Sequence, residues 1–133
     1  MFFEIDESDA LPIYEQVMRQ IKFAVAGGVI RPGELVSSVR ELARNLRINP
    51  NTVAKSFQRL QAEGVLVPVR GRGLAVADGA DVKCRTERTE LIRERLRVVL
   101  DEARRSYIAP AELLSMFQSE IASLEKELDH ESA

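Results

Sequence analysis

Polar and basic side chains occur at helical spacing in the segment NPNTVAKSFQRL, which begins at Asn49. Asn51 offers a donor and an acceptor to the edge of an adenine, and Thr52 offers a hydroxyl and a methyl group to thymine. Lys55 and Arg59 extend the same face toward guanine or phosphate. A helix N-terminus carries partial positive charge and free N–H groups, which attract a phosphate. These residue types in this order predict contacts with double-stranded DNA.

Arginines at two other places could contact the same duplex. Arg40 lies in the segment SVRELA, in the first turn of the preceding predicted helix, from which it could reach the edge of the groove. Arg70 and Arg72 flank Gly71 in the segment RGRG, where glycines permit close approach of the backbone. Arg70 and Arg72 are suited to contact the adjacent minor groove or its phosphates.

Several of these side chains also have an interpretation without DNA. Arg40 can be a solvated helix charge or the partner of a nearby carboxylate, and Asn51 can be a capping group in the first turn of its helix. Arg72 can keep an edge strand from pairing with another chain. For Arg59, the residue pattern leaves DNA contact and an ordinary surface position equally open.

Three helices are expected to position these residues. An apolar stripe over residues 11–28 predicts the first helix, with Pro12 at its first position and glycines at its end. Ser38 and Glu41 form a capping box that opens a short second helix, which runs to about residue 46. Asn49 is a good N-cap for the third helix, which is expected to end near Gly64 and to bury Val53, Ser56, Phe57 and Leu60.

The segment VLVPVRGRGLAVA, residues 65–77, contains two short valine-rich runs separated by a basic turn. This pattern predicts a β-hairpin. Pro68 has no N–H to donate, so its strand is expected to lie at an edge.

Residues 79–85 show no strong periodicity and are interpreted as a linker. From residue 86 onward the pattern predicts two helices with a break at Pro110. The second has apolar residues at the three and four spacing of a heptad seam, which requires a partner helix from its own chain, from a second subunit, or from both. The predicted dimer contacts are Leu96, Leu114, Phe117, Ile121, Leu124 and Leu128.

The predicted fold is therefore mainly α with a small β-hairpin: a winged helix-turn-helix followed by a C-terminal antiparallel helical hairpin. The expected organisation is a DNA-binding domain at 1–78, a linker at 79–85 and a helical dimerisation domain at 86–133. The charge distribution agrees with this division. The net charge is −2, yet residues 31–72 carry eight Lys or Arg side chains against three glutamates, a local charge of +5.

The sequence resembles the GntR family of bacterial transcription regulators, and within it the short YtrA-like subfamily. The matching segments are PIYEQV (12–17), RPGE (31–34), SVRELA (38–43), INPNTVAKSF (48–57), LQAEGVL (60–66) and GRG (71–73). The resemblance implies DNA contacts at Arg40, Asn51, Thr52, Lys55, Arg70 and Gly71. It also implies a homodimer on a palindromic operator, commonly a repressor, and often one that controls transport genes.

This sequence departs from the family pattern at three positions. Arg47 stands where many relatives have glycine, so the turn is either strained or shaped without a left-handed residue. Pro50 and Ala54 stand where relatives elsewhere in the family have arginine, which shifts the expected DNA contacts toward Lys55 and Arg59.

Several other classes of function are not expected. Cys84 is the only cysteine and His130 the only histidine, and neither has a catalytic or metal-binding neighbourhood in the sequence, so no enzyme, metal or cofactor is predicted. The longest apolar run, residues 23–30, is too short to span a membrane, and no secretory signal is evident, so the expected location is cytoplasmic. A small-molecule effector is left open. If present, it would bind between helices or subunits.

The main alternative is a protein-binding module, in which the third helix of a winged helix docks another protein and does not bind DNA. The exposed basic face of that helix is its only support in the sequence.

Overall fold

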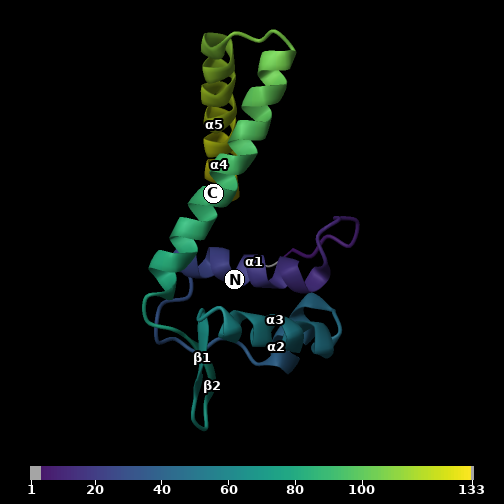
Figure 1. The fold of residues 1–133 in the computed structure, drawn as a ribbon, viewed down its shortest axis with the longest axis vertical. Helices are drawn as coiled ribbons and strands as arrows, with labels where there is room; N and C mark the ends of the chain where they lie inside the picture. The colour runs from purple at the N-terminus through teal and green to yellow at the C-terminus, as the bar shows by residue number, and fades with distance from the viewer. Residues whose placement is uncertain (1–3, 133) are drawn as a thin grey trace. The chain divides into compact units, whose positions relative to one another are not determined.

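The computed structural model describes residues 4–132, which divide into two units, one ending at Glu90 and the other beginning at Leu91 (Figure 1). In chain order the elements are α1 (Ile13–Ala26), α2 (Val39–Leu46), α3 (Pro50–Ala62), β1 (Leu66–Val69), β2 (Gly73–Val76), α4 (Ala80–Arg105) and α5 (Pro110–Ser132). The predicted fold class, a winged helix-turn-helix followed by a helical hairpin, is confirmed.

The helices of the first unit begin close to the predicted N-caps. The hydroxyl oxygen of Ser38 accepts a hydrogen bond from the backbone N–H of Glu41 over 3.1 Å at the start of α2. The side-chain oxygen of Asn49 accepts one from the backbone N–H of Asn51 over 2.8 Å, and Pro50 is the first residue of α3. The start of α1 differs from the prediction by one residue: Pro12 is the N-cap, and Ile13 is the first residue of the helix.

Arg47 connects α2 to α3 in the left-handed conformation, with φ 56° and ψ 46°. This geometry decides between the two alternatives for the turn: it does use a left-handed residue, although that residue is not glycine. Its cost for an L-residue with a Cβ is about 1 kcal/mol. The turn is held by the N–H of Ile48, which donates to the carbonyl oxygen of Ala43 over 3.1 Å.

The two strands form an antiparallel hairpin in which Leu66 pairs with Val76 and Pro68 with Leu74. The outer side of β2 is covered by the segment before α2, since the N–H of Val36 donates to the carbonyl oxygen of Leu74 and Leu35 forms a bridge with Ala75. Pro68 therefore lies in the edge strand of this sheet, as predicted.

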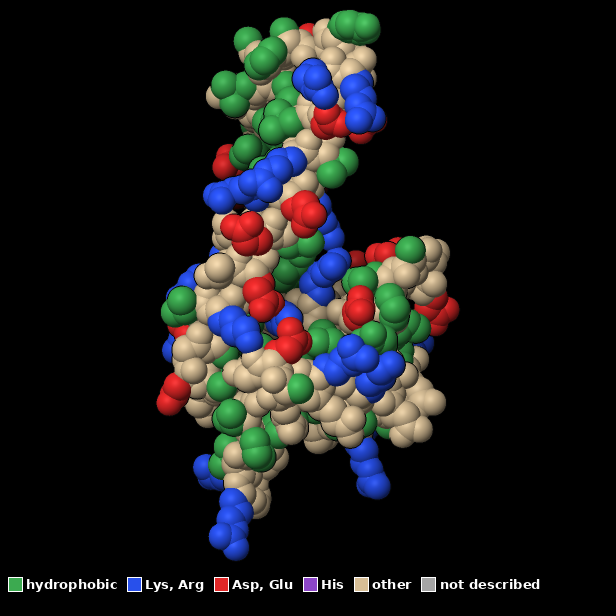
Figure 2. All heavy atoms as spheres, in the orientation of Figure 1, with side chains coloured by type: hydrophobic (Ala, Val, Ile, Leu, Met, Phe, Trp, Pro, Cys, Tyr) green, Lys and Arg blue, Asp and Glu red, His purple; other side chains and the backbone are tan. Residues whose placement is uncertain are grey.

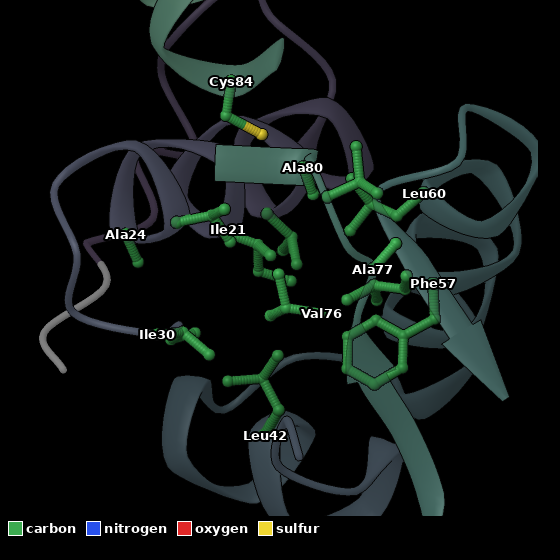
Figure 3. Packing of buried hydrophobic residues seen from close by; sticks show 14 of the residues in the cluster. Ile21, Ala24, Ile30, Leu42, Phe57, Leu60, Val76, Ala77, Ala80 and Cys84 are labelled. Atoms are coloured by element: carbon green, nitrogen blue, oxygen red, sulfur yellow. The ribbon is translucent and has the colours of Figure 1, made fainter. Parts of the chain in front are cut away.

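The core of the first unit joins all of its elements (Figure 3). Its fully buried side chains come from α1, α3, the hairpin and α4, and include Val17, Ile21, Val25, Val53, Leu60, Leu66, Val76 and Cys84. Leu42 of α2 and Phe57 of α3 are also buried in this cluster. The apolar faces predicted for the first and third helices are thus confirmed.

The structure corrects the predicted linker at 79–85. Only Gly79 precedes the helix, and residues 80–85 form the first turns of α4. Ala80 and Cys84, four residues apart, are 2% and 1% exposed in the core of the first unit. Because Ala80 and Cys84 are small, they give too little apolar periodicity for this helix start to be predicted. The same small size allows α4 to pack closely against the core of the first unit.

The second unit contains the remainder of α4 and all of α5. A break at residues 106–109 separates the two helices, with Tyr107 at a positive φ of 62°. Ala103 of α4 and Leu113 of α5 are buried, whereas most other apolar side chains of this unit are exposed. No helix within residues 4–132 is long and apolar enough to span a membrane.

Candidate nucleic-acid interface

The N-terminus of α3 differs from the expectation in one respect, because its backbone N–H groups are used within the chain. Pro50 has none, and the N–H of Asn51 donates to the side chain of Asn49. The N–H groups of Thr52 and Val53 donate to the carbonyl oxygen of Asn49 over 3.0 and 3.4 Å. A phosphate at this helix end would therefore be bound chiefly by side chains.

The side chains of α3 divide into a buried and an accessible face, as predicted. Val53, Ser56 and Phe57 are buried, whereas Asn51, Lys55 and Arg59 are exposed and Thr52 is half-buried. The hydrogen-bonding groups of the exposed side chains are therefore accessible to a partner. The apolar face of α3 packs in the core, and its polar face is directed toward solvent.

Tyr14, in the first turn of α1, lies beneath two of these basic side chains. The Nζ atom of Lys55 is 3.9 Å from the centre of the Tyr14 ring, and the Cζ atom of Arg59 is 4.7 Å from it. Both distances fit a cation–π interaction. Tyr14 lies within the apolar stripe predicted over residues 11–28, and no local signal in the sequence indicates that its ring faces these two cations.

Ser56 fixes α1 against α3 at the same place. Its Oγ atom donates toward the backbone carbonyl oxygen of Tyr14 at 2.8 Å, and the carbonyl oxygen of Thr52 lies 3.1 Å away. Ser56 is fully buried, and of its two acceptors the nearer one, the carbonyl oxygen of Tyr14, belongs to α1. The position of Tyr14 relative to α3 is therefore defined by a buried hydrogen bond.

The hairpin turn carries the other predicted contacts. The N–H of Arg72 donates to the carbonyl oxygen of Val69 over 2.9 Å, and Gly71 has φ 76°, as the third residue of a type II turn requires. Arg70, Gly71 and Arg72 are all exposed. Basic side chains, coloured blue, protrude from the end of the hairpin (Figure 2).

Arg40 is exposed in the first turn of α2. Neither Arg40 nor the hairpin arginines Arg70 and Arg72 takes part in a salt bridge with another residue in the described part of the chain. Their charges are therefore available to a polyanion. This geometry disfavours the interpretation of Arg40 as the partner of a nearby carboxylate.

Lys22 links three helices of the first unit. Its Nζ atom is 2.9 Å from Oε1 of Glu63, just after α3, and 3.0 Å from Oε2 of Glu87 in α4. Lys83 also donates to the backbone carbonyl oxygen of Glu63. Burial acts to lower the pKa of Lys22, but the hydrogen bonds to Glu63 and Glu87 outweigh it and raise the pKa above its ordinary value. This cluster ties the end of α3 to α1 and α4.

The predicted dimer contacts lie in the second unit. Leu96, Leu114, Ile121, Leu124 and Leu128 are between 40% and 62% exposed, and Phe117 is half-buried. A single chain thus leaves an apolar stripe uncovered on these helices.

The first unit has two short helices joined by a tight turn, and the second of them has an exposed polar face. With the basic hairpin that follows, they define a winged helix-turn-helix protein. A sequence profile described as bacterial regulatory proteins of the gntR family matches residues 13–76. The chain is also 36% identical over 100 residues to the HTH-type transcriptional repressor YtrA of Bacillus subtilis, which covers 75% of this chain and 77% of that protein. The chain therefore belongs to the GntR family.

Solved structures agree with this assignment. A transcriptional regulator from Oenococcus oeni superposes with a TM-score of 0.71 at 26% identity, covering 90% of this chain and 99% of that one. The DNA-binding domain of AraR in complex with operator ORX1 gives a TM-score of 0.52 at 27% identity, covering 58% of this chain and 99% of that one. The protein is a DNA-binding transcriptional regulator and not an enzyme.

Proposed function

We propose that the protein is a homodimeric repressor that binds a palindromic operator through α3 and the β1–β2 hairpin of each subunit. The observation that carries this proposal is the set of exposed polar and basic side chains on α2, α3 and the hairpin, above all Arg40, Arg70 and Arg72, which form no salt bridges within residues 4–132. Unpaired, exposed arginines favour binding to phosphate and to base edges.

In this proposal α3 enters the major groove. Asn51 and Thr52 read base edges near the start of the helix, and Lys55 and Arg59 contact guanine or phosphate one and two turns further along. Arg40 contacts the edge of the same groove. The hairpin places Arg70, Gly71 and Arg72 at the adjacent minor groove or its phosphates.

Dimerisation is supported by the exposed apolar stripe of the second unit. Leu124, for example, is 57% exposed. Covering such leucine side chains with a second copy of the chain removes apolar surface from water, which is favourable. The seam spacing of α5 fits packing against another helix. We assign DNA binding to the first unit and subunit contact to the second, a division within α4 at residues 90 and 91.

Repression is supported by the relative YtrA, which is named a repressor. Operator binding is supported by the structural neighbour AraR, whose DNA-binding domain is bound to an operator. The family resemblance further favours target genes for transport. A protein with this role works where the chromosome lies, in the cytoplasm.

The test is to select fragments bound by the full chain from sheared genomic duplex DNA and to measure affinity for the enriched sequence over a range of salt concentrations. The proposal predicts a palindromic consensus and a log–log salt slope of about −0.9 for each phosphate neutralised. Absence of any enriched sequence, with no salt-sensitive binding to duplexes, would contradict it. If no DNA binding is found and a pull-down with the chain yields a stoichiometric protein partner, a protein-binding module would be favoured instead.

A further inference from the structure

We propose that the ring of Tyr14 is a positioning element for DNA binding, which holds Lys55 and Arg59 in the orientation that meets the duplex. The inference rests on the proposed function and adds a residue from α1 to the interface. Tyr14 acts here through the two cations and not through its own hydroxyl group.

The arrangement of charges supports this role. Lys55 and Arg59 are four residues apart on α3, so their like charges lie on neighbouring turns and repel each other. The face of an aromatic ring is electron-rich and attracts both cations. At 3.9 Å from Lys55 Nζ and 4.7 Å from Arg59 Cζ, one ring holds both charged groups on the same side of α3.

The ring can position other groups because Tyr14 is itself held at two points. Its carbonyl oxygen accepts the hydrogen bond from the fully buried Ser56, and its hydroxyl donates to Oε1 of Glu15 over 3.1 Å. Tyr14 is half-buried, and its helix packs against α3 through the core. The bond from Ser56 fixes the backbone of Tyr14 relative to α3, and Tyr14→Phe keeps this bond.

Pre-orientation matters because long basic side chains lose much rotational freedom when they bind. Lysine and arginine have more rotamer entropy than most side chains, and ordering them before contact lowers the entropic cost of association. Lys55 and Arg59 are otherwise exposed. Without the ring, both would have to be ordered by the DNA alone.

The test is a set of variants of the full chain, with affinity measured on the selected duplex. Tyr14→Phe keeps the ring and is expected to bind within about twofold of the unchanged protein. Tyr14→Leu removes the ring and is expected to weaken binding about fivefold to tenfold. In a chain that already carries Lys55→Ala and Arg59→Ala, Tyr14→Leu is expected to change affinity less than about twofold further.

Three results would overturn the inference. Equal losses for Tyr14→Phe and Tyr14→Leu would assign the effect to the hydroxyl group. An equal loss from Tyr14→Leu with and without the two cations would show a purely structural effect on the helix pair. Unchanged binding by Tyr14→Leu would remove the role altogether, whereas absence of DNA binding by the unchanged protein would contradict the proposed function as well.

A measurement on the unchanged protein is independent of how the variants fold. A cation held over a ring places its neighbouring methylene groups in the shielding region of that ring. The ε-methylene protons of Lys55 are therefore expected to resonate upfield of those of Lys126, which is exposed on α5. Identical shifts for the two lysines would contradict the geometry.

Discussion

The Nζ atom of Lys22 lies 2.9 Å from Oε1 of Glu63, which joins the middle of α1 to the residue that follows α3. The lysine side chain is 17% exposed and the glutamate 37%, so water screens this pair less than an ordinary surface pair. Glu87 of α4 binds the same ammonium group. A single cation therefore holds the end of the proposed recognition helix against two other helices.

Lys22→Ala is expected to lower the free energy of unfolding by about 1–2 kcal/mol, because two partly buried carboxylates lose their hydrogen-bond donor. Arg104→Ala is the matched control. Arg104 pairs with Asp101 over 2.8 Å but is 78% exposed, so its loss should change stability by less than about 0.5 kcal/mol. Equal effects in urea unfolding would contradict the role assigned to the cluster.

The contribution of Lys22 is expected to depend on pH in the alkaline range. Its pKa in the folded protein is raised above 10.5, so the folded state holds this proton more tightly than the unfolded state. The stabilisation is fully present below pH 10.5 and is lost as the pH rises through the folded pKa. The stability difference between the unchanged protein and Lys22→Ala should be constant from neutral pH to about pH 9 and should shrink above pH 10.5. A difference that grew with alkaline pH would contradict this sign.

Arg47 offers a test of strain in the turn between α2 and α3. Glycine removes the penalty of the left-handed conformation but adds freedom to the unfolded chain, so Arg47→Gly is expected to raise stability by about 0.5 kcal/mol. Arg47→Val is expected to lower it by about 1 kcal/mol or more, since a β-branched residue tolerates positive φ poorly. Thermal unfolding of the two variants checks the order, and a valine variant as stable as the glycine variant would refute it.

Arg40→Ala and Lys55→Ala are each expected to weaken operator binding by about 1–3 kcal/mol if the side chain contacts a base. Arg105→Ala provides a control with the same loss of charge, at the end of α4 and 76% exposed. Its affinity should stay within about twofold of the unchanged protein. Titration of the selected duplex measures all three, and unchanged affinity of folded Arg40→Ala and Lys55→Ala would remove these residues from the interface.

Leu124→Glu is expected to convert the dimer to a monomer in sedimentation, because it places a charge in the apolar stripe. Leu124 is 57% exposed in the single chain, so the fold of each subunit should survive. Val98→Glu is the control, since Val98 is 64% exposed but lies about 200° around α4 from Leu96. A dimer that persists in Leu124→Glu would place the subunit contact elsewhere.

Local signals predicted much of the first unit. Ser38 and Asn49 can be predicted as caps because their side chains bond backbone N–H groups only two or three residues away. Pro68 predicted an edge strand because it lacks a donor, whatever its neighbours are. Features that depend on one residue and its immediate chain neighbours can be read from sequence.

Contacts between distant segments could not be read in this way. Cys84 belongs to the core, but its place there depends on the space left by other helices. Tyr14 is 41 residues from Lys55, and nothing near either residue indicates that they meet. The free N–H groups expected at the start of α3 were likewise already bonded within the cap, to the side chain and carbonyl oxygen of Asn49.

The most direct test of the proposed function is hydroxyl-radical footprinting of the 133-residue chain on the duplex that it selects. We expect two protected half-sites related by two-fold symmetry, with their centres about 34 Å apart, one turn of the double helix. Methylation of guanine N7 within either half-site should interfere with binding, since α3 is expected to read the major groove. Protection of a single continuous site without symmetry, or no protection at all, would contradict the account.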